Sequence, residues 1–249
     1  MDAAGLIELR QRIQDHLIGA FQAAEVLTKP FTHMSLAGAF PDEIYALLLQ
    51  SLPDAAYYQP DNPARNRRAD GLVTRSTLEL MPSALAALPL ELRELWSAVG
   101  EALRAPELKE VVFDRLAPGL CRRFRTGRAA LNRIPAYPVP TLVRDLGHYA
   151  IEPHPDSQAK IVTLMLYLPR DRDQLELGTA LYRLGWGSLG QLLRLRSPLV
   201  RAKQAEFAPN SGLAFAVGHT SWHGRETIPM DAGVRNLILQ FYYRRPDRR

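Results

Sequence analysis

The chain has very little cysteine. Cys121 is the single cysteine among 249 residues, so no disulfide can form within the chain. This is typical of proteins kept in a reducing compartment, and we expect a cytoplasmic protein. Cys121 itself is best interpreted as a small residue of the core.

Long apolar runs are also missing. No segment of about 18 uncharged apolar residues is present, which argues against a membrane span. The first residues, MDAAGLIELRQRIQDHL, carry charges where a signal peptide has its apolar stretch, so we do not expect export. Internal repeats and low-complexity tracts are absent as well, which excludes solenoid and fibrous architectures.

Acidic residues are outnumbered. The chain has 31 Lys and Arg against 26 Asp and Glu, a net charge of +5. The excess consists mostly of arginine, in CRRFRTGR (121–128), RLRSPLVRAK (194–203) and YYRRPDRR (242–249). Basic runs attract nucleic acids or acidic small molecules, but these lack the interleaved aromatics on which bases stack. They favour a solvated face or a site for an anionic substrate, and we do not expect a nucleic-acid partner.

Helical patterns dominate the first 110 residues. Apolar residues recur every three or four positions from Leu6 to Phe21 and predict a helix within 5–27. Residues 30–40 predict a short strand that leads into a helix starting at Pro41, since proline suits the first helical position. Residues 59–71 are polar and rich in turn formers, which indicates a loop. The pattern from 82 to 108 is helical again.

Short β-rich runs follow, at 141–154, 160–169, 179–184, 212–218 and 234–244. Several short strands separated by turn residues indicate a sandwich or barrel. We therefore expect an α+β protein, mainly β with a helical N-terminal part. Residues 1–110 would form a helical region packed on the core, and residues 111–249 a double-stranded β-helix (a cupin-like jelly roll), together making one structural domain.

One group of residues carries the chemistry. His154 and Asp156 lie two residues apart at the end of a predicted strand, so both side chains point to the same side. His223 follows much later, after another β-rich run. Two neutral imidazoles and one carboxylate leave three octahedral positions open, as in the facial triad of non-haem Fe(II) oxygenases. A His-x-Asp pair is common, and a histidine beside Trp222 is often a packed residue, so the prediction depends on the whole set.

Arg235 belongs to the last predicted strand, VRNLILQFYY. An arginine facing inward on such an apolar strand needs an anionic partner. Its planar guanidinium suits bidentate pairing with a carboxylate. An exposed position or a structural salt bridge is the alternative.

These features together resemble one family. An HxD pair, a β-rich run, a distal histidine and an arginine about ten residues further on look like the Fe(II)/2-oxoglutarate-dependent oxygenases, most closely the prolyl-4-hydroxylase-like branch. The similarity covers roughly residues 140–244. It implies that His154, Asp156 and His223 bind Fe(II) as the catalytic centre, and that Arg235 pairs with the distal carboxylate of 2-oxoglutarate, the cosubstrate used with O₂.

The resemblance also implies further cosubstrate residues. Thr163 and Tyr167 match positions that often reach the same carboxylate, and period-2 alternation independently places them with Met165 on one strand face. Ordinary strand packing is the alternative for both. Arg144 has the same parity as His154 in the run 141–154, so it would face the pocket and contact cosubstrate or substrate.

The expected reaction follows from the resemblance. Related halogenases replace the ligand carboxylate by a small residue, so the presence of Asp156 argues for hydroxylation. GTALYR (178–183) departs from the Gly-Gly-x-Leu of many relatives and indicates a distant or specialised subgroup. We expect hydroxylation of a small molecule, amino-acid-like or a biosynthetic intermediate, with release of succinate and CO₂. The same ligands serve desaturation, cyclisation and demethylation.

Three points stay open at this stage. A peptide, protein or nucleic-acid substrate is one alternative, and a non-catalytic jelly-roll binding protein is another. Residues 59–71 and 185–206 are the candidates for walls or a lid of the substrate pocket, because long segments between core strands are commonly binding loops.

Overall fold

The computed structural model describes residues 3–185 and 199–247. The strands in these residues are β1 (Val26–Leu27), β2 (His33–Ala37), β3 (Gln59–Pro60), β4 (Arg75–Glu79), β5 (Tyr137–Asp145), β6 (Ile151–His154), β7 (Lys160–Tyr167), β8 (Ala180–Leu184), β9 (Leu199–Gln204), β10 (Ser211–Ala216), β11 (His223–Arg225) and β12 (Arg235–Tyr243). The α-helices are α1 (Ala3–Ala23), α2 (Asp42–Gln50), α3 (Pro82–Leu85), α4 (Leu90–Arg104), α5 (Pro106–Arg115) and α6 (Ala117–Phe124).

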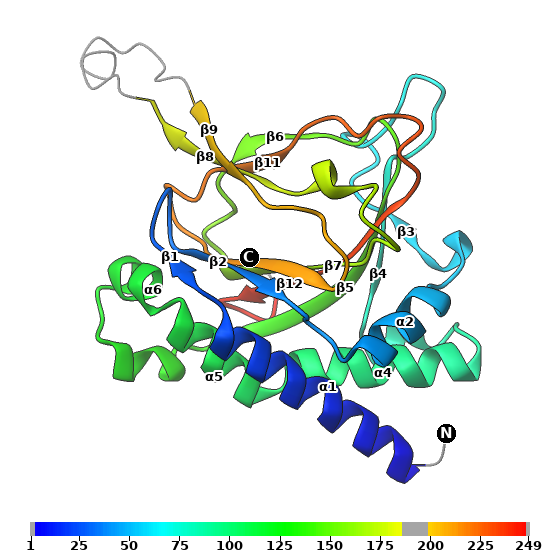
Figure 1. Cartoon of the computed structure of the whole chain (residues 1–249), viewed down its shortest axis with the longest axis horizontal. Helices are drawn as coiled ribbons and strands as arrows, with labels where there is room; N and C mark the ends of the chain where they lie inside the picture. Colours follow the sequence, from blue (N-terminus) through cyan, green and yellow to red (C-terminus); the bar gives the residue numbers. More distant parts are fainter. Residues whose placement is uncertain (1–2, 186–198, 248–249) are drawn as a thin grey trace.

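The strands form two sheets that face each other (Figure 1). The larger sheet has the order β1-β2-β10-β7-β12-β5-β4-β3, and the smaller sheet has the order β6-β11-β8-β9. Within the described residues, every strand pairing is antiparallel. Two facing antiparallel sheets are the architecture of a jelly roll, and the expected α+β fold is confirmed.

The helices cover the outer face of the larger sheet (Figure 1). Helices α1, α4 and α5 bury apolar side chains such as Ile13, Trp96 and Phe113 in one cluster with Leu164 and Ile238 of the sheet. The smaller sheet lies over the opposite face, so the central strands are covered on both sides. This explains why β7 is buried along nearly its whole length.

Alternation along β7 divides its side chains between the two layers, as the sequence predicts. Val162, Leu164 and Leu166 belong to the cluster beneath the helices. Met165 and Tyr167 belong to a second cluster, between the sheets. Residues of odd number on β7 therefore face the interior where a ligand can bind.

Two expected elements are interrupted. The helical pattern of 82–108 is divided by Pro89 and Pro106, which precede or open helices α4 and α5, because proline fits only the first turn of a helix. The expected strand 141–154 is divided between β5 and β6, which belong to different sheets. The chain turns between them, with His148 in a left-handed conformation at φ 70°.

The remaining expectations concern boundaries. Helix α5 extends past residue 110 and α6 follows it, while β4, from the first 110 residues, belongs to the larger sheet. The division into a helical region 1–110 and a β-helix 111–249 stays a prediction. Of the segment 185–206, residues 186–198 lie outside the described residues. Cys121 is partly buried against the helical cluster. In the described part of the chain, no helix has both the length and the apolar character needed to span a membrane.

Candidate metal centre and cosubstrate cavity

Three candidate metal ligands meet between the sheets. His154 ends β6 and His223 begins β11, and the two residues are direct partners in the antiparallel register. Asp156 follows His154 in the turn that leads to β7. One ligand atom from each residue lies within 4.8 Å of the other two. The structure therefore brings together the three side chains that the sequence predicts as ligands.

Backbone carbonyls orient both imidazoles in the same way. The Nδ1 atom of His154 lies 2.8 Å from the carbonyl oxygen of Glu152, and Nδ1 of His223 lies 2.9 Å from that of Ser221. Nδ1 therefore carries the proton in each ring, and Nε2 keeps a lone pair for a metal ion. Burial lowers the pKa of His223, against the opposing effect of Asp156, and this favours the neutral, metal-binding form.

Asp156 is held as a carboxylate. Its Oδ1 atom accepts a hydrogen bond from Lys160 Nζ at 2.5 Å, and its Oδ2 atom accepts one from Thr163 Oγ1 at 2.6 Å. Burial alone would raise the pKa of Asp156, but the charge of Lys160, together with the hydrogen bonds from Lys160 and Thr163, outweighs it, and the pKa lies below its ordinary value. Two neutral imidazoles and one carboxylate match the donor set of a non-haem Fe(II) site.

A buried charge network lies farther along the cavity. Arg235 is 2% exposed, and its Nη1 atom donates to Asp145 Oδ2 at 2.7 Å while Nε donates to the carbonyl oxygen of Leu177 at 2.7 Å. Arg75 donates to both oxygens of the same Asp145, at 2.6 and 2.9 Å. Two guanidinium groups thus share one buried carboxylate, and the charge of Asp61 also acts on Arg75. A ligand carboxylate beside Arg235 would add a second anionic partner for that guanidinium.

The candidate ligands and Arg235 line one cavity of about 470 Å³. Asp61 and Arg65 also line it, so part of the segment 59–71 forms a wall, as expected. Strands of both sheets line the cavity: Thr163 belongs to β7 and Arg235 to β12 of the larger sheet, and His223 belongs to β11 of the smaller sheet.

The two other predicted residues on β7 occupy different ends of this region. Thr163 donates to the candidate ligand Asp156, so its hydroxyl supports the metal end. Tyr167 is 1% exposed, and its ring centroid lies 5.7 Å from the guanidinium carbon of Arg235. Its hydroxyl donates to Thr179 Oγ1 at 3.1 Å, and Thr179 lines the cavity. Contact of Thr163 and Tyr167 with the cosubstrate stays a prediction.

The prediction that Arg144 faces the pocket is wrong. On β5, Asp145 lies opposite Arg235 and Arg144 lies opposite Asn236. Arg144 therefore points to the helical side, where its guanidinium carbon lies 5.5 Å from the ring centroid of Tyr58. Between Arg144 and His154 the chain turns from the larger sheet into the smaller one, and the alternation of side chains in β6 does not continue through that turn into β5.

Several residues of the site were not predicted. Arg75 and Asp145 lie on β4 and β5, and no local sequence pattern predicts that these two strands pair. Lys160 lies four residues after Asp156, and in a turn this spacing does not predict that the two side chains pair. Arg225 lies two residues after His223, so alternation along a strand places both side chains on the same face. This spacing is the one signal in the sequence that points to a residue of this group. Arg225 is 8% exposed and its Nη1 donates to the carbonyl oxygens of Glu176 and Gly178, both at 2.7 Å, while its buried Nε has no hydrogen-bond partner among the described residues.

Comparison with known proteins gives a fold and no sequence match. No protein family and no curated protein sequence matches the chain. The structure is similar to that of a prolyl-4-hydroxylase from Pseudomonas putida, with a TM-score of 0.50 and 13% identity over 94% of this chain and 99% of that chain. It is also similar to the epimerase SnoN in complex with Fe³⁺, alpha ketoglutarate and nogalamycin RO, with a TM-score of 0.50 and 10% identity over 92% of this chain and 83% of that chain. At these identities the likeness concerns the fold, and it agrees with the expected jelly roll.

Proposed function

We propose that this chain is an Fe(II)- and 2-oxoglutarate-dependent oxygenase that hydroxylates a C–H bond of a small molecule and releases succinate and CO₂. One observation carries the proposal: His154, Asp156 and His223 present ligand atoms within 4.8 Å of one another, in the cavity that Arg235 also lines. Binding of 2-oxoglutarate requires a metal to chelate one end of the molecule and a cation to pair with the carboxylate at the other end, in one cavity.

Each residue has a defined task in this proposal. His154, Asp156 and His223 hold Fe(II), and the metal with 2-oxoglutarate and O₂ supplies the oxidising chemistry. Arg235 pairs with the distal carboxylate of 2-oxoglutarate, and Asp145 fixes its guanidinium in place. The carbonyls of Glu152 and Ser221 keep the imidazoles in the tautomer that binds metal.

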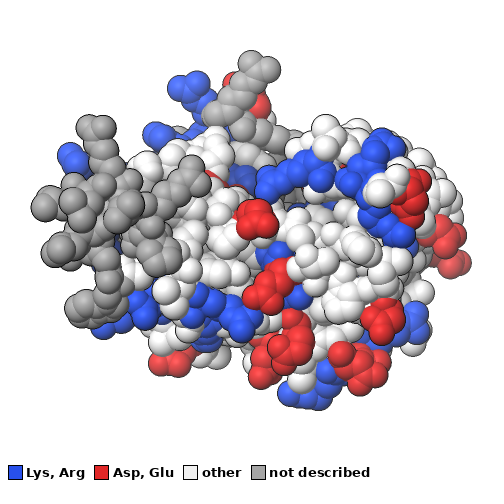
Figure 2. Space-filling model, turned by 90° about the horizontal axis from the view of Figure 1, so that it is seen from above, with Lys and Arg blue, Asp and Glu red and all other residues white. Residues whose placement is uncertain are grey.

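The cavity favours a small and acidic substrate. A volume of about 470 Å³ is in the range of small-molecule sites. Arg65 and Arg225 line it without a carboxylate partner in the described residues, so a substrate carboxylate would find a cation there. On the face seen from above the smaller sheet, basic and acidic side chains are interspersed (Figure 2). A polymeric polyanion would be better matched by a continuous basic surface. Location in the cytoplasm stays a prediction.

The test is a substrate screen that measures succinate. Protein purified without oxygen and loaded with Fe(II) is offered amino acids and small organic acids, with peptides and oligonucleotides as a second panel. Succinate formed only with the second panel would contradict the small-molecule proposal. Absence of both iron binding and 2-oxoglutarate binding would instead indicate a non-catalytic jelly-roll protein.

The matched variants are Asp156→Ala and Asp173→Ala. The first removes a candidate ligand, and the second removes an exposed carboxylate elsewhere. We expect substrate-dependent succinate formation to be abolished in Asp156→Ala and unchanged in Asp173→Ala. Full activity of Asp156→Ala with iron still bound would remove Asp156 from the ligand set.

A further inference from the structure

The two carboxylate oxygens of Asp156 have different surroundings. Oδ2 lies 3.6 Å from Nε2 of the candidate ligand His223, and it accepts the hydrogen bond from Thr163. Oδ1 accepts a short charge-assisted hydrogen bond from Lys160 Nζ at 2.5 Å. Oδ2 is thus the oxygen that lies beside another candidate ligand, while Oδ1 is occupied by an ammonium group.

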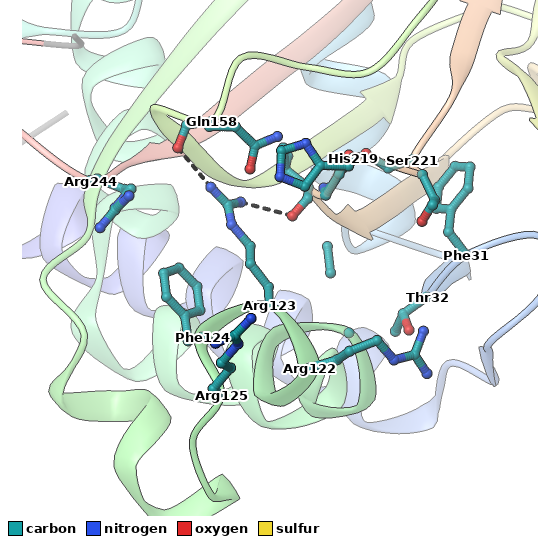
Figure 3. Close-up of a pocket in the computed structure, with 15 residues that line it drawn as sticks. Phe31, Thr32, Arg122, Arg123, Phe124, Arg125, Gln158, His219, Ser221 and Arg244 are labelled. Atoms are coloured by element: carbon teal, nitrogen blue, oxygen red, sulfur yellow. Dashed lines mark hydrogen bonds between the residues drawn. The ribbon is translucent and has the colours of Figure 1, made fainter. Parts of the chain in front are cut away.

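The main chain at Lys160 is held in place by hydrogen bonds. Its amide nitrogen donates to the carbonyl oxygen of Ser157 at 2.9 Å and closes the turn that leads into β7. Arg123, at the end of α6, donates to the carbonyl oxygens of Gln158 at 2.7 Å and Val217 at 2.8 Å (Figure 3). Arg123 also donates to the carbonyl oxygen of Lys160 at 2.6 Å. The start of β7 is therefore fixed to the helical side of the protein.

The ammonium group of Lys160 has two partners in the cavity. Besides its bond to Asp156, Nζ lies 3.6 Å from the ring centroid of Phe241 on β12, which is within the range of a cation–π interaction. All three side chains line the cavity of the candidate metal ligands. The side chain of Lys160 is 18% exposed and that of Asp156 is 4% exposed. These contacts hold an otherwise flexible positive charge next to the carboxylate.

This arrangement limits how Asp156 can bind a metal ion. A carboxylate can bind a metal through one oxygen or through both. The hydrogen bond from Lys160 makes Oδ1 less available as a donor, and the ammonium charge repels a metal cation on that side. One oxygen of Asp156 and one nitrogen from each histidine fill three of six octahedral positions. Chelation by 2-oxoglutarate fills two more, and the last is left for O₂. A second oxygen from Asp156 would fill that last position.

We propose that Lys160 is a positioning residue: by holding Oδ1 of Asp156, it restricts this carboxylate to one metal-binding oxygen and keeps a coordination position free for O₂. Lys160 acts through Asp156 and does not itself bind the metal ion. The proposal rests on the proposed function, because it concerns the iron that His154, Asp156 and His223 would hold.

The experiment compares the parent protein with Lys160→Met, which removes the ammonium group at a similar side-chain length. Isothermal titration calorimetry without oxygen measures the affinity for Fe(II). We expect binding to be about threefold tighter or more, because a second oxygen becomes available and a neighbouring positive charge is lost.

Electron paramagnetic resonance then tests the free position directly. Nitric oxide, a probe of the position that O₂ would take, is added to protein loaded with Fe(II) and 2-oxoglutarate. We expect the signal of iron-bound nitric oxide, per bound iron, to fall about fivefold or more in Lys160→Met. Lys160→Leu, a second neutral variant, should behave in the same way.

Two further variants serve as controls. Lys160→Arg keeps a cation that can donate to Oδ1, and it should retain at least about half of the nitric oxide signal. Lys29→Met removes an exposed lysine outside the cavity, and it should match the parent protein in both measurements. Circular dichroism checks that each variant is folded.

The results separate this proposal from the proposed function. Weaker Fe(II) binding in the neutral variants would show that Asp156 gains no second bond to the metal, and an unchanged nitric oxide signal per bound iron would show that no position is lost. Either result would overturn the role of Lys160 and leave the proposed function standing. A parent protein that binds no Fe(II) would overturn both.

Discussion

His154 and His223 face each other across adjacent antiparallel strands, with ring centroids 4.6 Å apart. The register of β6 and β11 places the rings, and the carbonyls of Glu152 and Ser221 orient them. The pairing of these two strands therefore brings two of the three candidate ligands together.

A metal ion that binds these side chains only in the folded protein should stabilise the fold. We expect Co(II) or Mn(II), used in place of Fe(II), to raise the free energy of unfolding by about 2.7 kcal/mol at 100 times the dissociation constant. Urea denaturation with and without metal measures this. His223→Ala should lose the gain, while His16→Ala, on the exposed side of α1, should keep it. An equal gain in both variants would place the metal elsewhere.

Asp145→Asn should be strongly destabilising. Asp145 is fully buried and is the carboxylate shared by Arg75 and Arg235. Its neutralisation leaves buried guanidinium charge without compensation, at a cost of about 3–5 kcal/mol. The comparison is Asp114→Asn, which loses an exposed pair with Arg128 and should change stability by about 1 kcal/mol or less. Urea denaturation measures the free energy of unfolding of both variants. A similarly small decrease in both would contradict the proposed role of Asp145 in the charge network.

Arg235→Lys tests the proposed cosubstrate contact. Lysine keeps the charge but has no planar fork to bond Leu177, Asp145 and a ligand carboxylate together. We expect KM for 2-oxoglutarate to rise about tenfold or more, roughly 1.4 kcal/mol in binding, with a smaller change in kcat. Arg144→Lys, on the neighbouring strand but on the helical side, should leave KM unchanged. The reverse order of effects would assign the contact to Arg144.

His33 should make stability depend on pH. It is fully buried, its Nε2 has no partner in the described residues, and burial lowers its pKa below 6.5. Below pH 6.5 the unfolded chain takes up a proton that the folded chain excludes, so the free energy of unfolding falls as the pH drops from 6.5 towards the lowered pKa.

The variant His33→Gln removes this proton. Its stability should depend less steeply on pH between 6.5 and 5, by up to about 1.4 kcal/mol per pH unit. His16→Gln, at an exposed position, should keep the slope of the parent protein. Identical slopes in all three proteins would show that His33 does not titrate in this window.

The sequence predicts local features of the fold well. Alternation in 160–168 separates Thr163 and Tyr167 from Val162 and Leu164 because a central strand covered on both faces keeps its period of two. Helices and strands appear where periodicity is strong. A single helical pattern over 82–108 does not account for Pro89 and Pro106, which lie before α4 and at the start of α5.

The charge network of the candidate site depends on which strands pair with each other in the sheet. The placement of Asp145 opposite Arg235 results from the pairing of β5 with β12, and Arg75 joins through the pairing of β4 with β5. No local pattern specifies these pairings. The error at Arg144 has the same origin. The turn between β5 and β6 joins two different sheets, so the alternation of side chains in β6 does not predict which side chains of β5 face the cavity.

The most direct test of the central claim is an anaerobic titration of the protein with Fe(II) and 2-oxoglutarate, followed by absorbance. If His154, Asp156 and His223 hold one iron beside Arg235, a metal-to-ligand charge-transfer band should appear only when both components are present, saturate at one iron per chain, and be lost in His154→Ala and His223→Ala. A band that persists unchanged in both variants, or fails to appear in the parent protein, would contradict the account.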